Sequence, residues 1–263
     1  SLRDMTRVRL MGVLLVLALA TGCAPRPAQP TASSSADPVG GDPDVSATDL
    51  PDNALYDVPA VGACGQWSRP YNLQKARWVA CNRRHQTSVY YVGLQPHRLR
   101  SDFGVASKKL SVYANRECLR NFTRVVPKPT NRNAVMLAWV VYFPNADQAA
   151  RGAAWFACHT YNATTPRGRP LPGAGPTYWK GSNIPRSLQR CIRVVGSSWK
   201  VKPCSAPHTH RFLRAVKHSG ARYPGDHALS NYAKDNCPSG FVMWPQRTSW
   251  QIGDRSITCW VSG

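Results

Sequence analysis

The stretches LSVYANRECLRNF (Leu110–Phe122) and LSNYAKDNCPSGF (Leu229–Phe241) share Leu, Ser, Tyr, Ala, Cys and Phe at identical offsets. Farther along each copy, a proline is followed eight residues later by a glycine and six residues after that by a cysteine. These residues are Pro144, Gly152 and Cys158 in the first copy and Pro245, Gly253 and Cys259 in the second. Earlier in each copy, a histidine follows a cysteine at a distance of four, as Cys81/His85 and Cys204/His208. This many matches at fixed offsets predict a tandem duplication.

The repeated stretch has the pattern of an amphipathic helix. In the first copy, Leu110, Tyr113, Ala114 and Cys118 fall at i, i+3, i+4 and i+8, on one face of a 3.6-residue period. We expect this helix over 106–122 and its counterpart over 228–237, with Asp226 as the N-cap of the second. Short β-branched and aromatic segments predict strands around both helices. They lie at 61–67, 76–82, 88–94, 134–143 and 153–161 in the first copy, and at 191–196, 199–204 and 210–216 in the second.

The predicted fold class is therefore α+β, with two tandem disulfide-stapled repeats. Each repeat is a small, mostly antiparallel sheet packed by one main helix. From the repeated cysteine to the following proline, the first copy spans 26 residues and the second only 8. The second repeat should thus be a trimmed version of the same frame.

Eight cysteines divide evenly between the repeats, and Cys23 is the odd one out. An even number in an exported chain is typical of a disulfide framework. Because each repeat should form the same two bonds, we predict Cys64–Cys81, Cys118–Cys158, Cys191–Cys204 and Cys237–Cys259. Each bond would stabilise the fold by about 3 kcal/mol in the loop-closure picture. The alternative, a reactive thiol beside a histidine, would need a free thiolate.

The start of the chain resembles an export signal. Residues 1–22 hold three arginines and then the apolar run LMGVLLVLALA, which is too short to span a membrane. The run leads through small residues into Cys23, which is typical of a bacterial lipoprotein signal with Cys23 as the lipidated residue. The alternative is an ordinary secretion signal with an incidental cysteine. Residues 23–60 are rich in Pro, Ser and Asp and predict a disordered acidic tether.

Beyond the tether, we divide the chain into a first repeat at 61–161, a Pro/Gly-rich linker at 162–187 and a second repeat at 188–263. The region from Val61 onward carries thirty Lys and Arg against six acids, a formal charge of about +24. Such a charge favours anionic partners and is screened by salt. Because the chain should lie outside the cytoplasm, we expect anionic envelope polymers or lipid headgroups as partners rather than nucleic acid.

Few residues suggest a catalytic or metal site. His85, His208 and His210 are the candidates by position, since the first two recur between the repeats. Zinc would need three or four Cys or His ligands with free thiolates, so oxidised cysteines leave only imidazoles, and we expect neither a metal nor another cofactor. The simpler interpretation is that His85 and His208 fill the turn after the disulfide. Asp254 and Arg255 should form an ion pair in a Gly-Asp-Arg turn, with catalysis by Asp254 as the alternative.

These motifs resemble the septum-formation family of actinobacterial envelope proteins. The resemblance rests on PCSAPH (Pro203–His208), YPGD (Tyr223–Asp226), a helix that ends in cysteine, and a final segment, Pro245–Cys259, with Trp and Gly-Asp-Arg. The first repeat keeps the cysteines but has ACNRRH in place of PCSAPH. The resemblance implies an envelope location and a link to division septa, and it supplies no catalytic residues.

Together these observations predict a non-enzymatic binding or scaffolding lipoprotein on the outer face of the cytoplasmic membrane. Division or cell-wall proteins are further possible partners. The alternative is a secreted metal- or histidine-dependent hydrolase that acts on cell-wall material.

Overall fold

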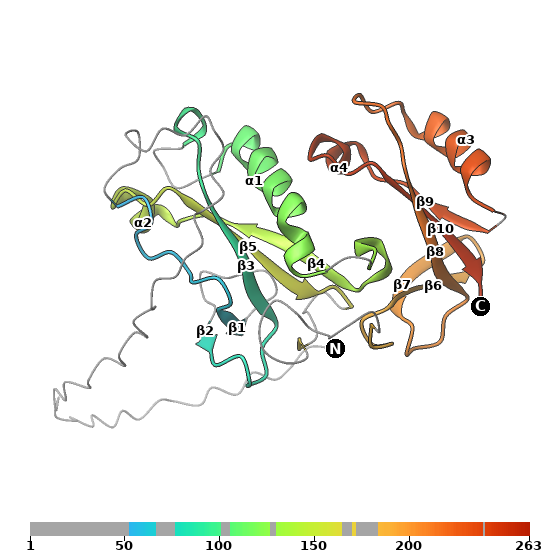
Figure 1. The fold of residues 1–263 in the computed structure, drawn as a ribbon, viewed down its shortest axis with the longest axis horizontal. Coiled ribbons are helices and arrows are strands. Elements are labelled where there is room, and N and C mark those ends of the chain that lie inside the picture. Colours follow the sequence, from blue (N-terminus) through green and yellow to red (C-terminus); the bar gives the residue numbers. More distant parts are fainter. Residues whose placement is uncertain are drawn as a thin grey trace, which may run out of the picture. The chain divides into compact units, whose positions relative to one another are not determined.

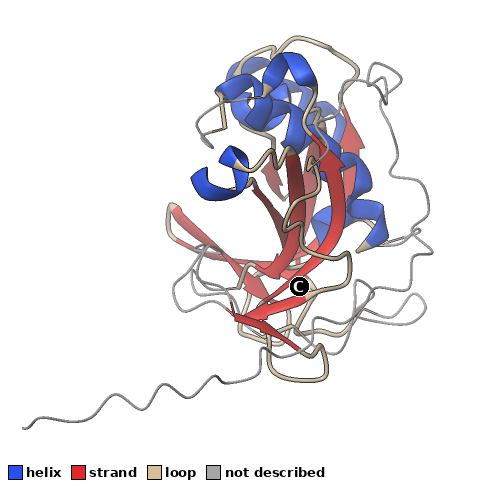
Figure 2. Ribbon diagram, turned by 90° about the vertical axis from the view of Figure 1, so that its left-hand side faces the viewer, coloured by secondary structure: helices blue, strands red, loops and turns tan. Residues whose placement is uncertain are grey.

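The structure is a computed structural model that describes residues 53–66, 77–100, 106–126, 130–164, 170–171, 184–238 and 240–263. Cys23 and residues 1–22 lie outside this part, as do most of the predicted tether and most of the predicted linker. Helices and strands both contribute to the fold, so the class is α+β, as predicted (Figure 2). Within the described ranges, the structure has no helix that is long and apolar enough to cross a membrane.

The first repeat forms a five-stranded antiparallel sheet with the order β2-β1-β3-β5-β4 (Figure 1). Its strands are β1 (Cys64–Gln66), β2 (Arg77–Val79), β3 (Thr87–Leu94), β4 (Leu137–Tyr142) and β5 (Trp155–Asn162). The main helix α1 (Lys108–Asn121) follows β3, and the short helix α2 (Ala146–Ala150) lies between β4 and β5. Short 3-10 turns occur at His97–Leu99, Phe122–Arg124 and Arg132–Ala134.

The second repeat forms a sheet with the corresponding order, β7-β6-β8-β10-β9. Its strands are β6 (Arg190–Val195), β7 (Ser198–Pro203), β8 (His210–Lys217), β9 (Phe241–Met243) and β10 (Ser256–Ser262). Its helices are α3 (Asp226–Asn236) and α4 (Arg247–Gln251). Each element thus has a counterpart at the same place in the first sheet, which is the structural signature of a duplication.

The two sheets also share one β-bulge. In the first sheet the register shifts between Val89 and Tyr91, so that Tyr90 is the extra residue opposite β5. In the second sheet the shift falls between the partners of Cys259 and Trp260, and Leu213 is the extra residue. A bulge inserts one unpaired residue and bends its strand. Its recurrence makes Tyr90 and Leu213 equivalent positions.

Helix α1 agrees closely with the range expected from sequence. The Ser107 side chain accepts a hydrogen bond from the Leu110 amide at 3.1 Å, which caps the first turn. Leu110, Ala114 and Cys118 are buried, as the periodicity predicts. The helix ends at Asn121, and a 3-10 turn continues the chain from Phe122.

Helix α3 begins two residues earlier than expected, and the N-cap prediction for Asp226 is wrong. The N-cap is Gly225, whose φ of 94° is readily adopted only by glycine. Asp226 is instead the first helical residue. Its carboxylate accepts hydrogen bonds from the Tyr223 hydroxyl and, at 3.1 Å, from the Trp244 indole.

Two further differences concern short elements. The short helices α2 and α4 are not among the predicted elements, although Asn145 and Gln148 form a capping box that marks the start of α2. The shortened segment between Cys237 and Pro245 still contains the edge strand β9, which has three residues where β4 has six. The trimming therefore shortens this strand without removing it.

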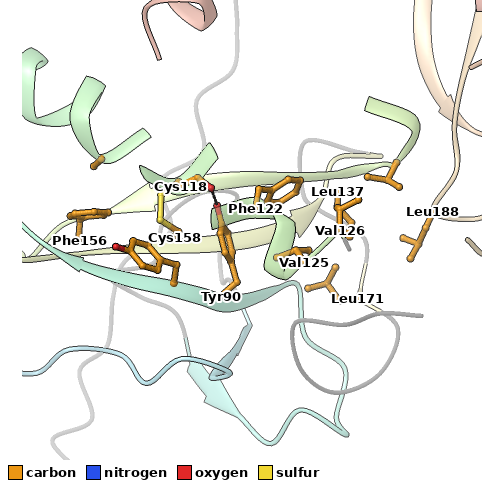
Figure 3. Packing of buried hydrophobic residues seen from close by; sticks show 13 residues of the cluster. Tyr90, Cys118, Phe122, Val125, Val126, Leu137, Phe156, Cys158, Leu171 and Leu188 are labelled. Carbon is orange, nitrogen blue, oxygen red and sulfur yellow. Dashed lines mark hydrogen bonds between the residues drawn. A yellow bond between two sulfur atoms is a disulfide. The ribbon is translucent and has the colours of Figure 1, made fainter. Parts of the chain in front are cut away.

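The first core lies between α1 and its sheet (Figure 3). Tyr90 packs edge-on against Phe122 with ring centroids 5.6 Å apart, and its hydroxyl donates to the Cys118 carbonyl at 2.9 Å. Val125 and Val126, which follow the helix, are also buried in this cluster. The second core is smaller and centres on Leu229, Ala233, Trp250 and Ile257.

Two segments outside the first sheet complete the first repeat. Residues 53–58 belong to the predicted tether, yet the Ala54 and Tyr56 carbonyls accept hydrogen bonds from the Ala154 amide and the Trp155 indole, each at 2.9 Å. Leu188, the first residue of the predicted second repeat, is 1% exposed and belongs to the first core.

All four predicted disulfides are present. They join Cys64 to Cys81, Cys118 to Cys158, Cys191 to Cys204 and Cys237 to Cys259. The second and fourth connect the main helix, or its C-cap, to the last strand of its sheet, as expected. Disulfides persist in oxidising compartments, so the folded part is extracytoplasmic.

Candidate functional site

The recurring histidines occupy the same turn in both repeats. Nδ1 of His85 donates to the Arg83 carbonyl and Nδ1 of His208 to the Ala206 carbonyl, each at 2.8 Å. Each bond reaches back two residues and closes the turn that follows the disulfide. This geometry matches the structural interpretation given above.

His210 and His159 lie on the opposite face of their sheets from the main helices. Nδ1 of His210 lies 2.8 Å from the Thr209 hydroxyl, and its ring packs against Phe241. His159 is fully buried, and its Nδ1 lies 3.3 Å from the Thr87 hydroxyl. Burial lowers the pKa of His159 to about 3, so this imidazole is neutral at physiological pH.

Asp254 and Arg255 do not pair with each other as predicted. The carboxylate of Asp254 accepts from the Arg132 guanidinium at 2.7 Å and from the Ser256 amide at 3.0 Å. The guanidinium of Arg255 lies over the Trp250 ring, 4.3 Å from its centroid, and donates to backbone carbonyls that include Gly220. Asp254 and Arg255 therefore have different partners. The ion pair of Asp254 is formed with Arg132, which is distant in the sequence.

The motifs of the second repeat meet around Trp250 and Asp226. Trp250 contacts the rings of His218 and Tyr223, with centroids 5.3 and 5.6 Å away. Hydrogen bonds from Tyr223 and then from Trp244 lower the pKa of Asp226. The YPGD motif and the Trp/Gly-Asp-Arg segment therefore build one aromatic scaffold that fixes the entry to α3.

The described residues do not bring these candidates together. Within the part of the chain that the structure covers, there is no cluster of three or more His, Cys, Asp or Glu side chains that could hold a metal ion. His85 and His208 lie in equivalent turns of the two repeats, and His210 begins strand β8.

The second sheet carries a row of cations on the face that holds its cysteines. Directly paired residues of antiparallel strands project to the same face. The register pairs Cys191 with both Lys202 and Arg211, and it pairs Arg193 with Lys200. Cys259 is paired with Arg214 in the same way. We call these five residues the basic face: Arg193, Lys200, Lys202, Arg211 and Arg214.

The basic face is open to solvent and has no acidic partner. Four of its cations are exposed and Lys202 is half-buried. The described part of the structure places no carboxylate within ion-pair distance of Arg193, Lys200, Lys202 or Arg211. Arg214 donates to the Asn236 carbonyl at 2.6 Å, at the C-terminal end of α3, where a cation is favoured.

The equivalent face of the first sheet is less exposed and much less basic. The register assigns Gln66, Arg77, Val79, Ser88 and Tyr91 to the five positions, and these include one cation. Ser88 and Tyr91 are buried, Gln66 and Val79 are half-buried, and Arg77 is exposed. In the segment that follows α1, the Arg124 guanidinium lies 5.4 Å from the centroid of the Tyr91 ring. The second repeat lacks most of that segment, since only 8 residues separate its cysteine from its proline. The two buried positions of the first sheet, Ser88 and Tyr91, thus correspond to the exposed Arg211 and Arg214 of the second.

Sequence reasoning recognised the positive charge but missed this face. The cations lie on three strands and come together only through the register. One available signal was the alternation of Arg193, Lys200 and Lys202 with apolar residues along two adjacent predicted strands.

The fold and this surface define an extracytoplasmic, disulfide-stapled α+β protein built by duplication, with the basic face on its second repeat. Its sequence matches the family described as Septum formation over residues 61–241, and the chain belongs to that family. This confirms the resemblance and relates the protein to septum formation. No curated protein and no solved structure matches the chain.

Proposed function

We propose that this protein is a non-enzymatic binding module of the cell envelope that acts at the division septum and holds anionic envelope components on its basic face. In this proposal Cys23 carries the lipid anchor, and the folded part lies outside the cytoplasmic membrane. The family supports the link to septum formation. The single observation that carries the binding role is the basic face of the second sheet, where four of the five cations are exposed and no described carboxylate pairs with Arg193, Lys200, Lys202 or Arg211.

The charge distribution supports a binding role over a purely structural one. From Leu188 to the end, the chain holds eleven Lys and Arg against three Asp. Arg193 and Lys200 are directly opposed across two strands, and like charges in this position cost roughly 0.2–1 kcal/mol. A fold gains nothing from this repulsion, whereas a polyanion bound across both strands would relieve it.

The test is the binding of isolated envelope fragments at increasing salt. Replacing Arg193, Lys200, Lys202 and Arg211 together by Gln should weaken binding and flatten its salt dependence, because each cation near an anionic surface contributes about 1 kcal/mol. The matched control replaces Arg83, Arg84, Lys108 and Lys109, which are equally basic and exposed. Equal losses in both variants, or binding that ignores salt, would contradict the proposal.

A further inference from the structure

The β6–β7 hairpin ends in exposed apolar side chains, which the charge argument does not explain. Val195 is 64% exposed and Trp199 is 47% exposed. Both lie beside the turn at Gly196, where Val195 pairs with Ser198 and Val194 with Trp199. Side chains alternate between the faces of a strand, so Val195 lies on the basic face and Trp199 on the opposite one. The tip of the hairpin therefore carries an apolar side chain on each side, and the Trp199 ring also packs against Phe241 of β9, with centroids 5.8 Å apart.

The cations stand behind this tip in two rows. Arg193 and Lys200 form the first row, two residues back from Val195, and Lys202 and Arg211 form the second, on either side of Cys191. With a rise of about 3.3 Å per residue, the first row lies about 7 Å and the second about 13 Å behind Val195. Apolar groups of interfacial proteins enter a bilayer by roughly 5–10 Å. The first row thus lies at headgroup depth when the tip is inserted.

The hairpin is held in a fixed shape. β6 and β7 pair over six consecutive residues, and the Cys191–Cys204 disulfide closes the open end. β7 is an edge strand of its sheet, so only one of its sides is paired. Insertion of such a tip does not require the segment to fold on binding, which would otherwise oppose it.

We infer that the β6–β7 hairpin docks on an anionic lipid bilayer, with Val195 and Trp199 inserted at the interface and Arg193, Lys200, Lys202 and Arg211 on the headgroups. This inference rests on the proposed function and selects the bilayer among the anionic components of the envelope. A soluble polyanion would engage the cations but would leave Val195 and Trp199 in water. Tryptophan is enriched at membrane interfaces because one end of its ring is apolar and the other is polar.

The experiment uses the chain from residue 23 onward with Cys23→Ser, which keeps every residue that the structure describes. Binding to vesicles of phosphatidylglycerol and phosphatidylcholine is measured by sedimentation, and insertion by quenching of tryptophan with acyl-chain-brominated lipids. Inorganic polyphosphate serves as the soluble polyanion. Vesicles of phosphatidylcholine alone report binding without charge.

We expect binding to the anionic vesicles and quenching of tryptophan. Trp199→Ala should weaken vesicle binding about tenfold while leaving polyphosphate binding unchanged. Removal of one basic-face cation should weaken vesicle binding and polyphosphate binding alike, each by about fivefold. The matched control is Trp78→Ala, since Trp78 is 48% exposed on the edge strand of the first sheet, and it should leave both unchanged.

The outcomes separate the inference from the proposed function. Polyphosphate binding without vesicle binding would overturn membrane docking and leave the basic face as a polymer site. Vesicle binding that is insensitive to Trp199→Ala, or reduced equally by Trp78→Ala, would overturn insertion of the hairpin. Binding to none of these probes or to envelope fragments would remove the proposed function as well.

Discussion

Tyr90 and Leu213 occupy the same bulge position in two sheets of the same topology, but Tyr90 is 1% exposed and Leu213 is 44% exposed. Tyr90 contacts Phe122 and donates to the Cys118 carbonyl. Phe241, the sequence counterpart of Phe122, lies in the edge strand β9 and packs against the rings of Trp199 and His210 instead. This one pair shows how the duplicated frame produced a closed core in one repeat and an open surface in the other.

The pair predicts opposite responses to the same substitution. Tyr90→Ala should lower the free energy of unfolding by about 3–5 kcal/mol, because it leaves a cavity and an unpaired carbonyl. Leu213→Ala should change it by no more than about 0.5 kcal/mol, as is usual for exposed positions. Urea denaturation of both variants checks this. Similar losses of unfolding free energy in the two variants would mean that Leu213 is buried in the folded protein.

The disulfides should contribute to stability in the order of their loop lengths. Replacing Cys118 and Cys158 together by Ala opens a separation of 40 residues and should cost about 4 kcal/mol, whereas Cys191 and Cys204, 13 residues apart, should cost about 3 kcal/mol. Denaturation under non-reducing conditions measures both. Peptide mapping without reductant should recover four links within repeats, and a link between repeats would refute the pairing.

His159 predicts a fall in stability at mildly acid pH. Its folded pKa of about 3 lies below the ordinary value of 6.5, so the unfolded chain binds the proton first. The contribution of the neutral His159 to the free energy of unfolding is complete above about pH 6.5. It falls as the pH decreases, by at most about 1.4 kcal/mol per pH unit. His159→Gln should remove this part of the pH dependence. The measurement is the melting temperature of both chains in buffers between pH 4 and 6.5.

His210→Gln is the matched control, since His210 is only half-buried. An identical pH dependence in the wild-type chain and in His159→Gln would show that other groups are responsible.

The ion pair between Arg132 and Asp254 should show measurable coupling. Their side chains are 32% and 20% exposed, so solvent screens the pair in part. A double-mutant cycle with Arg132→Gln and Asp254→Asn should give about 0.5–1 kcal/mol. Arg120–Glu117 is the comparison pair: Arg120 is 67% exposed, and a coupling of roughly 0.3–0.5 kcal/mol is expected there. A larger coupling energy for Arg120–Glu117 than for Arg132–Asp254 would show that solvent screening does not determine the two coupling energies.

Metal analysis tests the hydrolase interpretation. We expect no stoichiometric zinc in the purified protein, because the cysteines are oxidised and each recurring histidine uses Nδ1 for a backbone carbonyl. The zinc bound per chain is measured by plasma emission spectrometry, after dialysis against zinc and removal of the unbound metal. Stoichiometric zinc that is lost on His85→Ala or His208→Ala would restore the metalloenzyme hypothesis.

The duplication, the disulfide pairing and the α+β class could be predicted from sequence because they depend on local periodicity and on spacing. A helix such as α1 follows from the positions of Leu110, Ala114 and Cys118, and equal spacings in two copies require equal bonds. The short helices and the N-cap at Gly225 were missed, because they depend on backbone geometry over a few residues. Asp254 was assigned an adjacent partner, and its actual partner, Arg132, comes from a distant part of the sequence.

The sequence by itself determined the frame and its total charge. Only the tertiary structure decided where that charge is presented. Arg193, Lys200, Lys202 and Arg211 are spread over three strands, and strand pairing at a particular register is a long-range interaction that no local pattern contains. Whether a position is core or surface depends in turn on what packs over it: Tyr91 of the first sheet is buried, whereas its counterpart in the second sheet, Arg214, is exposed.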